Sequence, residues 1–188
     1  MNSQSMPFAL LLVVALFGCA PPWATLAQSG PPSALAGAPA VSVMFNFNEA
    51  NIGGVPVQQE LASLSPDERA DLEGAFGDMQ SAFMEEFAGR VGVPVMPAQA
   101  APQPGEVRAE VAFTYMQRGP RGPIGFSNTE VTAQIRWSVG GQITDVIEMT
   151  RVSKPALTRP SVAQRLRICA SGLGALTAKF FEREQGRL

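Results

Sequence analysis

The chain has 188 residues, of which 16% are charged, and its formal net charge is −2. One domain is the default expectation at this length. It contains no histidine, which excludes Ser-His-Asp and Cys-His catalysis, histidine-ligated zinc and a histidine pH switch. The net charge gives no electrostatic support to nucleic-acid binding, so no nucleic-acid partner is expected.

The amino-terminal stretch has no charged side chain before Glu49. Residues 8–17 form an unbroken apolar run, FALLLVVALF. This run is too short for a membrane span, which needs about 20 residues, but it fits the apolar region of a signal peptide. We therefore predict that residues 1–18 are a signal peptide.

The apolar run ends in Leu16-Phe17-Gly18-Cys19. This resembles the lipobox of bacterial lipoproteins, in which a Leu, a variable residue and a Gly precede the lipidated Cys. The resemblance implies a lipid on Cys19 that anchors the chain to a membrane, and Ala20 after it implies the periplasmic side of the outer membrane. Two or three acyl chains give a stable anchor. Two alternatives stay open: cleavage at 25–27, which would release a soluble periplasmic protein, and a retained buried helix.

Residues 19–40 are predicted to be the lipidated Cys followed by a Pro- and Ala-rich tether. Residues 20–40 include five Pro, seven Ala and no charge. Such a stretch lacks the apolar surface to fold, and at about 3.1 Å per residue it would reach roughly 65 Å. Trp23 is expected at the membrane interface, where Trp is common.

Residues 41–188 are predicted to be a single α+β domain. Strict alternation predicts a strand over 41–48, and Gly and Pro indicate a loop over 49–64 with one short extended piece near Val55 and Val57. The capping box at Ser65 begins a helix that Gly92 and Pro94 end. Its apolar stripe, typical of a core-facing helix, is Leu72, Phe76, Met79, Phe83 and Phe87.

A Pro-rich connection over 93–105 leads to three strands predicted over 106–117, 129–139 and 143–152. For the turn at 140–142, a three-residue loop aligns the apolar faces of the last two strands and places Ile135 opposite Ile147. Several apolar contacts outweigh the single ion pair that a two-residue loop would give. Asp145 then lies beside Trp137 and is expected to accept its indole N–H.

A last helix is predicted to begin near 158–161 with a capping box at Ser161. Cys169 lies in its apolar stripe, which predicts a buried and inert thiol. The small residues Gly172 and Ala175 would allow close packing. The fold class is thus α+β: a four-stranded, mainly antiparallel sheet with two helices on one face, in the order β-α-β-β-β-α.

The connection over 118–128 is the most distinctive candidate binding loop. It places two cations and two apolar side chains on a loop stiffened by Pro and Gly: Arg118, Arg121, Ile124 and Phe126. Such a loop suits an anionic glycolipid or an envelope protein partner. The alternative is an ordinary surface connection.

No residue pattern predicts a catalytic, metal or cofactor site. The acids Asp67, Asp71 and Asp78 share one side of a helix and are typical of a solvated face. The element order behind a lipobox resembles small envelope lipoproteins, namely the lipopolysaccharide-assembly lipoprotein, transporter-auxiliary lipoproteins and the curli-secretion family. This implies a non-catalytic binding or assembly component. The alternatives are a soluble secreted protein of structural role and a carboxylate-dependent hydrolase.

Overall fold

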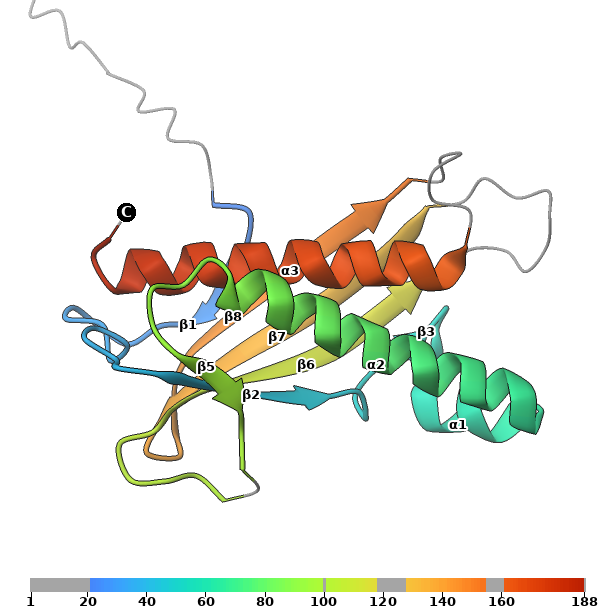
Figure 1. Cartoon of the computed structure of the whole chain (residues 1–188), viewed down its shortest axis with the longest axis horizontal. Helices are drawn as coiled ribbons and strands as arrows, with labels where there is room; N and C mark the ends of the chain where they lie inside the picture. The colour runs from blue at the N-terminus through green and yellow to red at the C-terminus, as the bar shows by residue number, and fades with distance from the viewer. Residues whose placement is uncertain (1–20, 100, 118–127, 155–160, 188) are drawn as a thin grey trace, which may run out of the picture.

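The computed structural model describes residues 21–99, 101–117, 128–154 and 161–187, which form a mixed α+β structure (Figure 1). The α+β prediction is confirmed. Among the described residues there are three helices and a sheet of eight strands. In chain order the elements are β1 (Ala24–Ala27), β2 (Val41–Asn46), β3 (Asn51–Ile52), β4 (Val55–Pro56), α1 (Val57–Ser63), α2 (Pro66–Ala88), β5 (Val95–Pro97), β6 (Val107–Gln117), β7 (Thr129–Val139), β8 (Gln142–Ser153) and α3 (Val162–Glu184).

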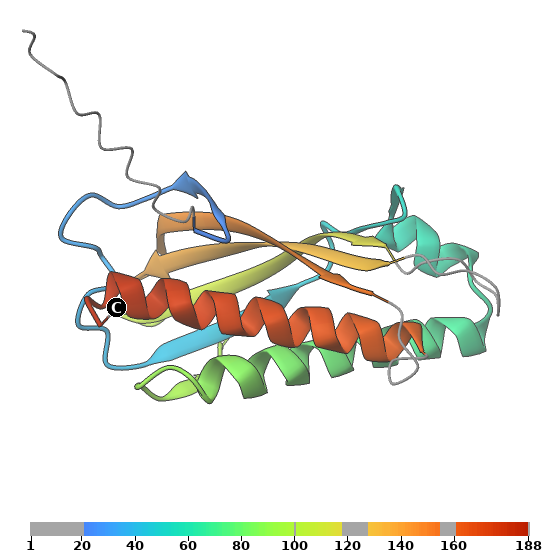
Figure 2. The ribbon, with the colours of Figure 1, turned by 90° about the horizontal axis from the view of Figure 1, so that it is seen from above.

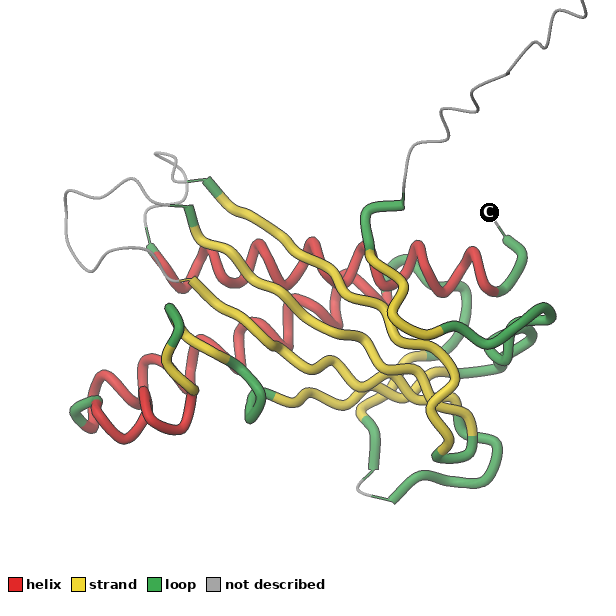
Figure 3. The backbone as a smooth tube through the Cα atoms, turned by 180° about the vertical axis from the view of Figure 1, so that it is seen from behind, coloured by secondary structure: helices red, strands yellow, loops and turns green. Residues whose placement is uncertain are grey.

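The sheet has the order β1-β8-β7-β6-β2-β5, with the short β3 beside β6 and β4 beside β3. The pairs β1–β8, β7–β8 and β6–β7 are antiparallel, whereas β2 runs parallel to both β5 and β6. The predicted four strands are β2, β6, β7 and β8. The sheet has four strands more than predicted, because β1 and β5 extend it at its two edges and the short β3 and β4 add to it beside β6. Figure 3 shows the sheet face that no described helix covers.

Both long helices lie on one side of the sheet, as predicted (Figure 2). The Ser65 hydroxyl accepts from the Glu68 N–H at 3.4 Å and the Glu68 carboxylate accepts from the Ser65 N–H at 3.1 Å, which is the predicted capping box. At α3 the Ser161 hydroxyl accepts from the Gln164 N–H at 3.1 Å. The short β5 and three long strands, β6, β7 and β8, separate the two helices along the chain. The three long strands cross the sheet an odd number of times, so α3 begins at the same end as α2 and the two helices run parallel (Figure 1).

Aromatic side chains join the helices to the sheet. Phe47 is stacked between Phe76 of α2, at 4.4 Å between ring centroids, and Phe113 of β6, at 4.5 Å. Trp137 of β7 stacks on Phe181 of α3 at 5.4 Å. Every residue of the stripe predicted for α2 is buried, and so is the apolar stripe of α3 that contains Cys169, which consists of Leu166, Cys169, Leu173, Leu176 and Phe180.

The two long helices approach each other most closely at Gly174. A Cβ on Gly174 would lie 2.6 Å from the carbonyl oxygen of Phe83, a distance that real structures do not tolerate. A Cβ on Gly172 would instead lie 3.0 Å from the Arg151 side chain of β8. The small residue that lets the helices touch is therefore Gly174, whereas Gly172 faces the sheet.

The β7–β8 hairpin has a two-residue turn but the strand alignment that was expected from a three-residue turn. Ile135 pairs with Ile147, as predicted, but the loop has two residues, Gly140 and Gly141, both with positive φ. Thr144 is skipped in the pairing between Ile143 and Asp145. This bulge restores the apolar alignment that a three-residue loop was expected to supply, so the prediction of loop length is wrong and that of the faces is right.

Candidate functional site

None of the residues that the sequence predicts to be functional is among the described residues. Cys19, and the loop residues Arg118, Arg121, Ile124 and Phe126, lie outside the described residues. The described chain resumes at Pro21, two residues after Cys19. The site that the structure does build is the segment that follows, residues 21–40, which we call the N-terminal segment.

Trp23 fixes the start of the N-terminal segment to α3. Its side chain is 7% exposed and meets Phe180 edge-on, with 5.7 Å between ring centroids. The guanidinium of Arg183 lies 5.0 Å above the indole ring, a cation–π contact. Trp23 is thus part of the protein core, and the expectation that it lies in a membrane interface is wrong.

Strand β1 adds the N-terminal segment to the sheet. Ala24 pairs with Glu148 and Thr25 with Ile147, and a shift follows before Ala27 pairs with Val146. All four β1 side chains are exposed, and Leu26 is 54% exposed. Because its side chains bury little surface, β1 is held by backbone pairing and by the anchors on either side of it.

Asp145 of β8 provides the second anchor. The carboxylate is fully buried and accepts hydrogen bonds from the Ser29 N–H at 3.0 Å and from the Ser29 hydroxyl at 3.1 Å. The Trp137 indole N–H, which was expected to donate to Asp145, has no partner among the described residues. That prediction is wrong because Ser29 supplies the donors that a buried carboxylate requires.

Leu35 also holds the N-terminal segment against the domain. It is fully buried, and its carbonyl accepts a hydrogen bond from the side-chain amide of Gln185, just after α3. The prediction of an extended tether is therefore wrong for residues 21–40. These residues cannot form a core of their own, but they bury Trp23 and Leu35 in the core of the domain.

The helix-free face of the sheet carries a chain of paired polar side chains. Both terminal guanidinium nitrogens of Arg136 donate to the Glu49 carboxylate, at 2.7 and 2.6 Å, and the Glu110 carboxylate lies 3.5 Å from the same guanidinium. Hydrogen bonds from Arg136 lower the pKa of Glu49, and the same pairing raises the pKa of Arg136. These groups hold one another in fixed charge states.

A second polar cluster joins β2 to β6 beside a cavity of about 220 Å³. The Ser42 hydroxyl donates to Glu106, and Arg108 contacts the same carboxylate at 3.1 Å. Hydrogen bonds from Ser42 and from the Gln103 N–H lower the pKa of Glu106. A carboxylate held ionised in this way is a weak proton acceptor, so it does not activate Ser42 as a nucleophile.

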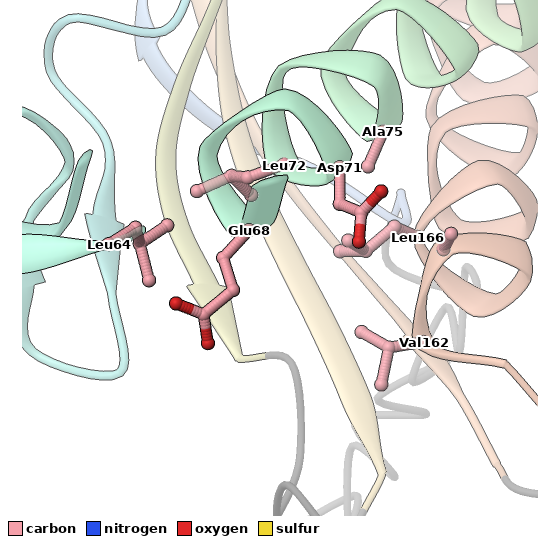
Figure 4. A pocket seen from close by; sticks show the side chains of 8 residues that line it. Leu64, Glu68, Asp71, Leu72, Ala75, Val162 and Leu166 are labelled. Carbon is pink, nitrogen blue, oxygen red and sulfur yellow. The ribbon is translucent and has the colours of Figure 1, made fainter. Parts of the chain in front are cut away.

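A second cavity, of about 210 Å³, lies where α1 ends and where α2 and α3 begin (Figure 4). Its floor is apolar, with Leu72 and Leu166 buried, and Glu68 and Asp71 lie at its rim. Glu68 already serves the α2 capping box. Among the described residues no group of three or more Cys, Asp or Glu side chains could hold a metal ion.

Cys169 is buried as predicted, at 2% exposed. Burial raises the pKa of its thiol to about 11. The thiol lies 3.7 Å from the carbonyl oxygen of Thr129. Because the thiolate is the reactive form, Cys169 is inert at neutral pH.

Among the helices that the structure describes, none combines the length and apolar character that crossing a bilayer requires. No protein-family model matches the chain. No curated protein matches its sequence.

Solved structures overlap with the chain partially and at low identity. The PelC dodecamer from Paraburkholderia phytofirmans is 14% identical, with a TM-score of 0.43, over 81% of this chain and 97% of that one. A minor lipoprotein from Acinetobacter baumannii is 13% identical, with a TM-score of 0.42, over 80% of this chain and 95% of that one. A point variant of the Paraburkholderia phytofirmans PelC dodecamer is 17% identical, with a TM-score of 0.42, over 84% of this chain and 98% of that one.

Proposed function

We propose that this chain is a bacterial envelope lipoprotein, anchored through Cys19, whose domain acts on the periplasmic side of the outer membrane as a non-catalytic binding or assembly component. The observation that carries the proposal is the Leu16–Cys19 motif at the end of a ten-residue apolar run. An apolar run of this length suits export, and the cysteine at its end suits lipid attachment.

The N-terminal segment supports lipidation over the soluble alternative. Cleavage after the 25–27 motif would remove all of β1 together with Trp23, which is 7% exposed against Phe180. Removal of a buried Trp is among the most destabilising single changes in a protein core. Cleavage before Cys19 would instead keep all of β1 and its contacts.

Three of the described carboxylates, those of Glu49, Glu106 and Asp145, support a non-catalytic role over the hydrolase alternative. A hydrolase of this class needs one carboxyl group whose pKa is raised, so that it can act as an acid near neutral pH. Hydrogen-bond donors instead lower the pKa of Glu49 and of Glu106. Asp145 is covered by Ser29 and is closed to a substrate.

The test is the intact mass of the protein made in a bacterial envelope, wild type beside Cys19→Ser, with membrane fractionation. We expect a wild-type chain that begins at Cys19, carries lipid mass and sediments with membranes. The Cys19→Ser chain should carry no lipid mass and should not sediment with membranes. A wild-type chain that begins near Gln28 and stays in the soluble fraction would refute the proposal.

The loop over 118–128 is proposed to contact an anionic glycolipid or an envelope protein. Its Arg118 and Arg121 supply cations suited to phosphate groups, and Ile124 and Phe126 supply apolar contacts. Replacing both arginines by Ala should reduce lipid binding and crosslinking to partners. A matched control replaces the exposed helix residues Arg69 and Arg167 by Ala. Equal binding by the two double variants would refute this role.

A further inference from the structure

We infer that the sheet edge formed by β1 and its partner β8 lies directly against the lipid surface, with the opposite end of the domain directed away from it. The inference rests on the proposed lipidation of Cys19. It goes beyond that proposal because lipidation alone would allow the domain to float at the end of a long tether. What fixes the position is the docking of the N-terminal segment.

The length of chain between lipid and domain sets the first constraint. Only residues 20–22 separate Cys19 from the buried Trp23, and two of these three are Pro. At about 3.1–3.6 Å per residue, four steps span roughly 14 Å. An undocked tether through residue 40 would reach roughly 65 Å. Docking therefore brings the anchored edge to the depth of the lipid headgroups.

The surface at this edge suits such a contact. The four β1 side chains are exposed and uncharged, and Leu26 presents an apolar side chain at 54% exposure. Pro21 and Pro22, just before β1, are exposed as well. An uncharged strand can approach headgroups without the cost of removing an ionised group from water.

The contacts of the N-terminal segment also fix the orientation. A domain attached at a single flexible point would rotate freely, whereas Trp23, the β1–β8 pairing and the Ser29–Asp145 hydrogen bonds hold the segment at three successive places. Helix α1 and the start of α2 lie at the other end of the molecule (Figures 1 and 3). The 23 residues of α2 span about 35 Å at 1.5 Å per residue, so that end projects away from the membrane.

A site-specific fluorophore can measure this placement. Cys169 is 2% exposed and its thiol has a raised pKa of about 11, so it does not compete for a thiol-directed label. Lipidation blocks Cys19. A single cysteine introduced as Leu26→Cys in β1, or as Gln59→Cys in α1, therefore becomes the labelling position. Both positions are exposed, which makes them a matched pair.

The labelled lipoproteins are reconstituted in vesicles of phosphatidylethanolamine and phosphatidylglycerol that contain a lipid with a nitroxide on its headgroup. We expect the label at position 26 to lose most of its fluorescence and the label at position 59 to keep it. A further variant carries a spacer of about 20 Gly and Ser residues between Ala20 and Pro21. It should abolish the quenching at position 26, because such a spacer adds about 25 Å on average.

The outcomes separate the two proposals. Weak and equal quenching at positions 26 and 59, from a chain that carries lipid mass and stays with the vesicles, would overturn the placement and leave the lipoprotein proposal standing. Stronger quenching at position 59 would reverse the orientation. A chain without lipid mass that does not bind the vesicles would overturn both proposals.

Discussion

The docking of the N-terminal segment depends most on Trp23, so Trp23→Ala is the sharpest single perturbation of this fold. The side chain is 7% exposed, meets Phe180 edge-on and lies under the Arg183 guanidinium. Its removal leaves β1, whose own side chains are exposed, without the anchor that precedes it.

The size of the effect follows from the contacts that are lost. Replacing a core Trp or Phe by Ala costs about 3–5 kcal/mol, and an exposed cation–π contact contributes about 0.5–1 kcal/mol of stability. Trp23 lies at the rim of the core, where neighbours can close part of the gap, so we expect the lower end, about 3 kcal/mol. A loss of this size raises the population of the undocked segment about 100-fold.

Urea unfolding and limited digestion with a broad-specificity protease together measure this effect. We expect Trp23→Ala to shift the unfolding midpoint and to be cut within residues 21–40 far faster than the wild type. The control is Trp23→Phe, which keeps an aromatic ring against Phe180 and should lose about 1 kcal/mol. Equal rates of cleavage within residues 21–40 in the wild type and in Trp23→Ala would refute the docking argument.

Three further predictions address packing, the buried carboxylate and pH. Gly174→Ala should destabilise the protein by about 2 kcal/mol in urea unfolding, because the added Cβ would lie 2.6 Å from the α2 backbone. The control Gly77→Ala, which has no atom near its Cβ, should stabilise the protein by about 1 kcal/mol. Equal effects of the two substitutions would contradict the close helix contact. Ser29→Ala should cost about 2 kcal/mol because the buried Asp145 carboxylate loses a hydroxyl donor, and the same change in an Asp145→Ala background should cost almost nothing. The pKa of Glu106 is lowered below its ordinary 4.5, so its contribution to stability is present above that pH and is lost as the pH falls through the lowered value. Between pH 5 and pH 3 the Tm of Glu106→Gln should therefore fall less than that of the wild type. The same decrease of Tm with pH in both proteins would contradict this.

The long helices and the central strands are predictable from the sequence because their signals are local. Ser65 and Ser161 mark helix starts through hydrogen bonds to residues three positions later. Alternating apolar residues such as Ile135 and Trp137 mark a strand with one buried face. Interactions this short in sequence need no knowledge of the tertiary structure.

The elements that have no local signal in the sequence depend on distant partners. Strand β1 has exposed side chains and exists because β8 offers an unpaired edge, while Trp23 contacts Phe180 and Leu35 contacts Gln185, each more than a hundred positions away. Helix α1 did leave a local signal, since Val57, Leu61 and Leu64 are spaced by four and three residues. Two Gly and one Pro lie just before these residues, and they favoured the prediction of a loop instead of a helix.

The candidate site was predictable only in part. The sequence predicts a lipid anchor at Cys19, which lies outside the described residues. Composition argued for a free tether after it, where the structure has a docked segment. Composition measures whether a stretch can form its own core, and it does not register a core supplied by the rest of the chain. The prediction of Trp137 as the partner of Asp145 was wrong for the same reason, because the actual partner, Ser29, lies 116 residues away in sequence.

The pairing of β1 with β8 has a further consequence for solubility. Strand β8 is twelve residues long, and β1 covers its backbone edge at residues 146–148, between the exposed apolar side chains of Ile143 at 63% and Val152 at 51%. Long edge strands with exposed apolar residues pair readily with other copies and aggregate, and proteins avoid this by covering them. A chain trimmed to begin at Ala40 should therefore self-associate through β8, visible as a rise in light scattering that the full chain does not show.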